Sequence, residues 1–275
     1  MRRDDSAGAA GTPASSAQVG VAAFGAGTMI GTLGGLIGLG GAEFRLPVLI
    51  GGFGFAALEA VILNKAMSLV VVSALPFRAA AVPLGSVAAH WPVIVNLLAG
   101  SLAGAWLGAG WATRLNSETL HRVIAMLLAV IATVLLLSHG PSSGGPSILA
   151  GAAQAYVGVI AGFVIGVIAS LLGVAGGELL IPTLVILFGA DIKLAGSLSL
   201  AVSLPTMIVG FSRYSRDASF STLRRNRSFV LVMAAGSILG TFLGGQLLGL
   251  VPSAVLLPLL ALILLVSAVK VWRHL

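Results

Sequence analysis

The chain has 275 residues, 58% hydrophobic and 8% charged, with a mean hydropathy of +1.09 and a formal net charge of +7. Soluble globular domains carry about 25% charged residues, so this composition excludes an ordinary soluble domain and indicates a membrane protein. In such a chain the basic excess reports where lysine and arginine are retained beside the membrane, and we expect no nucleic-acid partner.

Three long windows, residues 79–113, 123–177 and 228–269, contain no Asp, Glu, Lys or Arg. Each window is long enough for at least one helix of about 20 residues across the hydrocarbon. An outer-membrane barrel would instead show short segments of alternating hydrophobicity. The sequence therefore predicts an all-α polytopic membrane protein with roughly 8–10 transmembrane segments.

The chain divides into a polar start and two apolar halves. Residues 1–18 are small and polar and are predicted to be a disordered N-terminal segment. The first transmembrane repeat, 19–138, contains apolar segments at 19–40, 44–55, 60–82, 92–113 and 119–138. A Ser/Gly/Pro-rich linker, 139–150, leads to the second repeat, 151–275, with segments at 151–174, 179–190, 194–211, 228–250 and 253–272.

The two halves are related by an internal duplication. The first begins with GTMIGTLGGLIGLGGAEFRLPVLI (27–50), which aligns with GFVIGVIASLLGVAGGELLIPTLV (162–185) at an offset of 135 residues. The alignment continues without a gap to Arg78 and Arg213, and 17 of its 52 positions are identical. Further on, the offset becomes 136. Duplicated halves in a membrane protein are typical of transporters.

Basic residues predict that the halves are inserted in opposite orientations. After the third segment of the second half come five arginines, whereas the equivalent loop of the first half, 79–91, carries only His90. Lysine and arginine in short loops are retained in the cytoplasm. Equivalent loops therefore lie on opposite faces of the membrane. We expect inverted-topology repeats with both termini in the cytoplasm.

The second segment of each half has only about a dozen residues, too few to span the bilayer, and predicts a discontinuous or re-entrant helix. A glycine-rich end precedes it in both halves, followed by a glutamate and then a proline. The residues concerned are Gly40, Gly41, Glu43 and Pro47, with Gly176, Gly177, Glu178 and Pro182. A short helix N-terminus at membrane depth presents unpaired N–H groups that hold an anion. Alternatively, these glycines only let helices pack closely.

Glu43 and Glu178 are expensive inside a membrane unless they are protonated, paired or in contact with water. One interpretation is proton coupling or gating, in which the carboxylate changes protonation during transport. The other is that each carboxylate caps a helix N-terminus, where negative charge is favourable. The sequence leaves both open.

A second group of polar residues follows each short segment. The first half has Asn64, Lys65 and Ser68, and the second has Ser199 and Ser203 at the positions equivalent to Asn64 and Ser68. A spacing of four puts each pair on one helical face, which suits hydrogen bonds to a small oxyanion. The alternative is that each serine bonds a carbonyl of its own helix. Lys65 has no basic counterpart and either attracts an anion or marks a helix end.

Enzymatic activity is not expected. The chain has no cysteine, and its four histidines fall at segment ends without paired spacing, so we expect no metal site, no cofactor and no catalytic histidine. The sequence also has no P-loop pattern for nucleotide hydrolysis.

The duplicated glycine-rich end with its glutamate and proline, the Asn/Ser segment and the later GxxxGxxxG-like helix resemble the TauE/SafE sulfite exporter family. The resemblance covers roughly residues 20–272. The chain departs from the family's usual threonine-serine pair in the first half, where Met67 stands before Ser68. The residues that match its motifs are Gly41, Glu43, Pro47, Asn64 and Ser68, with Gly177, Glu178, Pro182, Ser199 and Ser203.

The resemblance implies a multi-pass protein of the prokaryotic cytoplasmic (inner) membrane. We expect a secondary transporter that exports a small sulfur-containing oxyanion, such as sulfite or an organosulfonate, by alternating access around a midplane site. An anion channel with the same duplicated fold is the alternative. The expected partners are the anion, membrane lipids and, through the glutamates, protons. The sequence leaves open whether the chain forms a homodimer.

Overall fold

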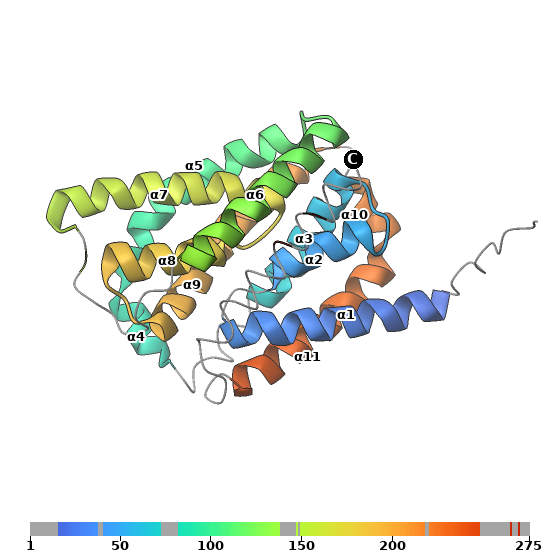
Figure 1. Ribbon diagram of the computed structural model, residues 1–275, viewed down its shortest axis with the longest axis horizontal. Helices are drawn as coiled ribbons and strands as arrows, with labels where there is room; N and C mark the ends of the chain where they lie inside the picture. Colours follow the sequence, from blue (N-terminus) through green and yellow to red (C-terminus); the bar gives the residue numbers. More distant parts are fainter. Residues whose placement is uncertain are drawn as a thin grey trace, which may run out of the picture.

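The computed structural model describes residues 16–37, 41–72, 82–137, 147, 149–217 and 220–247, with 265 and 269. Every element in these ranges is a helix, so the predicted all-α fold is confirmed. The first half contains α1 (Ser16–Ile37), α2 (Ala42–Gly51), α3 (Ala57–Val72), α4 (Leu84–Ala89), α5 (Trp91–Ala112) and α6 (Ser117–Leu137). The second contains α7 (Gly151–Leu172), α8 (Gly177–Phe188), α9 (Ile192–Tyr214), α10 (Ser221–Arg225) and α11 (Arg227–Leu247) (Figure 1).

Among the described residues, five helices are long and apolar enough to cross a membrane, namely α1, α5, α7, α9 and α11. Helix α1 begins at Ser16, slightly before the predicted start at residue 19. The short helices α4 and α10 were not predicted, because five or six residues carry too little periodicity to distinguish a helix from a loop. Residues 1–15, most of the linker and nearly all of the segment 253–272 lie outside the described residues.

Helices α1 and α11 pack backbone against backbone through glycines. A Cβ added at Gly31 would lie 2.3 Å from the carbonyl oxygen of Ser237, and one at Gly35 would lie 2.5 Å from that of Thr241. No larger residue fits here unless the partner helix moves. The residue numbers rise together along the two helices, so they run parallel. These two helices therefore pack closely through small residues.

Helices α5 and α7 make the equivalent contact. A Cβ at Gly166 would lie 2.3 Å from the carbonyl oxygen of Ser101. Gly166 is the repeat counterpart of Gly31, and Ser101 is the counterpart of Ser237. The first helix of each half thus packs on a late helix of the other half. Figure 1 shows α1 beside α11 and α7 beside α5, with α1 and α7 running in opposite directions across the view.

Both short helices begin at a left-handed glycine. Gly41, with φ of 68°, precedes α2, and Gly176, with φ of 81°, precedes α8. A side chain at such a φ is strained, and a Cβ at Gly41 would also lie 2.6 Å from the Ile30 carbonyl oxygen. Helices of 10 and 12 residues rise about 15–18 Å, roughly half of the hydrocarbon thickness. The predicted broken helices are present.

Pro47 and Pro182 lie further inside the short helices than their expected place at the helix start, each at the sixth residue. Proline has no N–H, so it removes the helical hydrogen bond to the carbonyl four residues earlier. In both halves that carbonyl belongs to the repeated glutamate, residue 43 or 178. The two helices are therefore weakened at the same point.

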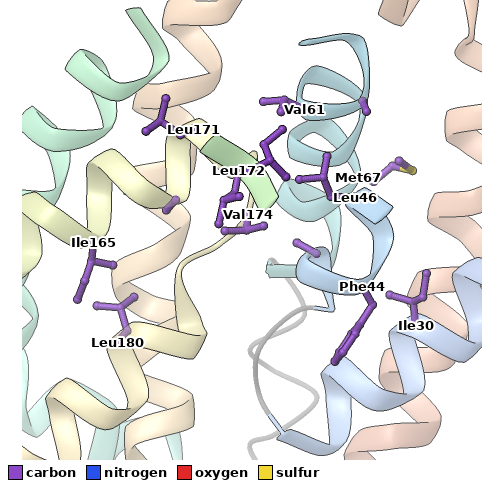
Figure 2. Close-up of a cluster of buried hydrophobic side chains, with 14 of the residues drawn as sticks. Ile30, Phe44, Leu46, Val61, Met67, Ile165, Leu171, Leu172, Val174 and Leu180 are labelled. Atoms are coloured by element: carbon purple, nitrogen blue, oxygen red, sulfur yellow. The ribbon is translucent and has the colours of Figure 1, made fainter. Parts of the chain in front are cut away.

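One apolar cluster joins both halves around the two breaks. In Figure 2, Leu172 and Val174, at the end of α7 and just beyond it, face Val61 of α3 and Leu46 of α2. All four side chains are fully buried. This contact fixes α3 between the break of its own half and the break of the other half.

The glycine packing can be tested by comparing two positions on α1. We expect Gly31→Ala to lower the free energy of unfolding by about 1–3 kcal/mol, because its Cβ would collide with the α11 backbone. Gly25→Ala is the matched control, since a Cβ there meets nothing within 4 Å and alanine favours a helix by about 1 kcal/mol. Thermal unfolding in detergent measures both. Equal melting temperatures would contradict the packing.

Candidate functional site

A buried arginine occupies the first turn of α2. The side chain of Arg45 is fully buried, and the contacts of its guanidinium include three neutral oxygen atoms of described residues. It donates to Asn64 Oδ1 at 3.3 Å and Ser68 Oγ at 3.1 Å, both on α3, and to Ser237 Oγ at 3.2 Å on α11. Asn64 and Ser68 therefore lie on one face of α3, as their spacing predicts. We call these four residues the Arg45 cluster.

The arginine orients the groups that it binds. Because each serine oxygen of the cluster accepts from Arg45, each hydroxyl proton is left to donate elsewhere. The Asn64 amide is fixed in the same way, with its oxygen toward Arg45 and its nitrogen turned to backbone carbonyls. The cluster thus combines a positive charge with oriented neutral donors.

Asn64 joins the two breaks. Its Nδ2 donates to the carbonyl oxygen of Ala42, at the start of α2, at 2.9 Å. It also reaches the carbonyl oxygen of Leu172, the last residue of α7, at 3.5 Å. One side chain therefore contacts the broken segments of both halves, which brings them to the same place in the fold.

Lys65, the next residue of α3, faces a different set of partners. Its side chain is fully buried, and Nζ donates to Ser170 Oγ on α7 at 3.1 Å. Nζ also lies 5.9 Å from the centre of the Tyr214 ring on α9, within the range of a cation–π contact. The interpretation of Lys65 as a helix-end marker is wrong, because the residue lies in the middle of α3.

The second-half residues bond mainly to backbone. Ser203 Oγ donates to the carbonyl oxygen of Ala175, in the connection between α7 and α8, at 2.7 Å. Ser199 Oγ donates at 2.9 Å to the carbonyl oxygen of Gly196 in its own helix, as in the alternative interpretation of these serines. Where the first half has Arg45, the second has Leu180, so the charge of the cluster is not duplicated.

The remaining predicted positions lie at the helix breaks. Gly41, Gly176 and Gly177 are buried at the starts of α2 and α8, where no described side chain caps the helix. A buried helix N-terminus has N–H groups that need acceptors. Gly40 and the side chains of Glu43 and Glu178 lie outside the described part of the structure.

Four residues of this region were missed by sequence reasoning. Arg45, Ser170, Tyr214 and Ser237 are not among the residues that the sequence patterns single out. All but Arg45 join the site only through contacts more than 40 residues apart in sequence, which no local pattern reports. The sequence does hold one signal for this site: Arg45 is charged, whereas its counterpart in the aligned segment of the second half is Leu180.

The apolar helices, the two breaks and the buried basic side chains define a polytopic helical membrane protein of the transporter class. The family described as Sulfite exporter TauE/SafE matches residues 22–272, and the chain belongs to it. This membership confirms the resemblance seen in the sequence and implies a membrane transporter of sulfite-type anions. No curated protein and no solved structure matches the chain.

Proposed function

We propose that this chain is a secondary transporter that exports a small sulfur-containing oxyanion, such as sulfite or an organosulfonate. The observation that carries the proposal is the Arg45 cluster, a fully buried guanidinium with oriented hydroxyl groups beside both helix breaks. A buried charge is expensive, and such charges in membrane proteins mark ion and substrate pathways. Guanidinium and hydroxyl donors match the oxygen atoms of sulfite.

The cargo is held by groups from three helices. Arg45 supplies charge from α2, Ser68 supplies a hydroxyl from α3 and Ser237 supplies one from α11, while Asn64 on α3 holds the guanidinium in place. The N-termini of α2 and α8 add partial positive charge from their helix dipoles. Most of the donors are neutral, which allows the anion to be released as well as bound.

Access alternates through relative motion of two helix pairs, each of which combines one helix from each inverted half. The first half contributes α1 to the pair with α11, and the second contributes α7 to the pair with α5. These two tightly packed pairs move as rigid units, with α2, α3, α8 and α9 between them, and the cargo binds where α2 and α3 meet α11. Rocking of one unit against the other opens the site to each side in turn.

The direct test is transport of radiolabelled sulfite into proteoliposomes with and without a pH gradient. We expect saturable uptake that a gradient drives uphill, and we expect Glu43→Gln and Glu178→Gln to abolish the uphill component, because glutamine binds no proton. Glu118→Gln is the matched control, since Glu118 is exposed and paired with Arg122 on α6.

Three outcomes would contradict parts of this proposal. Non-saturating flux without uphill exchange would favour an anion channel. Uphill transport that persists in both glutamine variants would assign the glutamates to helix capping. No sulfite transport by the native chain would remove sulfite as the cargo.

The contribution of the Arg45 cluster can be tested with a pair of equivalent serines. We expect Ser237→Ala to weaken apparent sulfite affinity about tenfold, because losing a hydrogen bond to a charged group costs about 1.5 kcal/mol or more. Ser101→Ala, at the counterpart position, removes only a contact with the Thr206 hydroxyl and leaves affinity unchanged. Concentration dependence of sulfite uptake measures both, and equal losses would argue against the cluster.

Inverted insertion in the cytoplasmic membrane, with cytoplasmic termini, also belongs to the proposal. Ser86 in α4 and Ser221 in α10 are exposed and lie in the equivalent connections of the two halves, and the chain has no native cysteine. In intact cells, a membrane-impermeant maleimide should label Ser86→Cys at once and Ser221→Cys only after permeabilisation. Labelling of both from one side would rule out the inverted arrangement.

A further inference from the structure

The amino group of Lys65 is fully buried, and the described structure places no carboxylate beside it. Within the described part of the chain, no carboxylate forms a salt bridge with its ammonium, and Ser170 Oγ is its one hydrogen-bond acceptor. An ammonium has three N–H donors, so two of them are available. A charged group in this position is stable only with a counter-charge or further acceptors.

The surroundings of Lys65 hold its ammonium in one place. Tyr214 Oη donates to the carbonyl oxygen of Ser170 at 2.8 Å, which fixes α9 against α7 and sets the tyrosine ring beside Nζ. Gly210, one turn before Tyr214, leaves the necessary space. A Cβ there would lie 2.7 Å from Lys65 Nζ and 2.8 Å from Ser170 Oγ.

The same contacts leave donors that converge. Ser170 Oγ accepts from Lys65, so its own proton is left to donate. The ammonium and this hydroxyl together offer at least three N–H or O–H donors to one ligand. Such a set matches two or more oxygen atoms that share one negative charge.

We propose that Lys65 and Ser170, supported by Tyr214 and Gly210, form a second anion site that takes a singly charged oxyanion. The site lies between α3, α7 and α9, whereas the Arg45 cluster lies between α2, α3 and α11. The inference rests on the proposed function, because it assigns a second position to the same class of cargo. Asn64 and Lys65 are adjacent on α3. This helix therefore contributes to one anion site with α2 and α11 and to the other with α7 and α9.

The test counts the anions bound by the purified full-length chain. Equilibrium dialysis with radiolabelled sulfite should give two anions per native chain and one per Lys65→Met chain. Lys193→Met is the matched control, because Lys193 is exposed at the start of α9, and it should bind two. Gly210→Ala keeps the lysine but displaces its ammonium, and should weaken one of the two sites about tenfold or more.

Thermal unfolding separates an anion site from a structural role. Methionine is apolar and similar in length, so Lys65→Met should be at least as stable as the native chain without sulfite. It should also gain less stability from added sulfite, because each ligand that binds only the folded state adds about RT ln(1 + [L]/Kd) of stability and one binding site has been lost. Lower stability without sulfite together with unchanged binding would make Lys65 a structural residue and overturn the proposal.

The outcomes also separate this inference from the proposed function. Sulfite transport by the native chain with identical binding curves for native and Lys65→Met would keep the transporter and remove the Lys65 site. One anion in the native chain and none in Lys65→Met would keep the Lys65 site and remove the Arg45 cluster as a binding position. Methanesulfonate, which is singly charged, replaces sulfite if the native chain does not transport it. Failure of both anions to bind overturns the inference.

Discussion

The structure depends on the burial of two interrupted helices inside a membrane protein. Lipid offers no hydrogen bonds to free backbone groups, so irregular backbone at membrane depth must be enclosed by protein or line a polar cavity. The glycine-packed pairs α1/α11 and α5/α7 provide that enclosure, because backbones this close exclude lipid along their length. Asn64 then satisfies a carbonyl at each break and holds the two interruptions together.

Duplication and charge have separate roles in this arrangement. The glycine stripes, the left-handed caps and the prolines occur in both halves, so the scaffold is approximately two-fold symmetric. Arg45 and Lys65 occur only in the first half. Their counterparts in the second half are Leu180 and Leu200. A symmetric scaffold thus supports an asymmetric set of charges. The proposed cargo meets its cations mainly on α2 and α3, and the second half supplies hydroxyl groups and an aromatic ring.

The sequence predicts the parts of this fold that repeat. Two copies of the Gly-Glu-Pro pattern are enough to locate both broken helices, and a spacing of four is enough to put Asn64 and Ser68 on one face. It does not predict the Arg45–Ser237 contact, because that hydrogen bond joins residues 192 positions apart. Nor does periodicity indicate that Lys65 is enclosed by α7 and α9, since its partners depend on how the halves exchange helices.

The exchange of helices between halves has a consequence for how the chain is made. Helix α1 is synthesised first, yet its packing partner α11 is the last of the long described helices to leave the ribosome. Until then the glycine-lined face of α1, with Gly27, Gly31 and Gly35, contacts lipid or another protein. A protein truncated before α11 therefore exposes a ready-made groove to any small-residue helix nearby. The cell's insertion and quality-control machinery has to shield α1 through nearly the whole of translation.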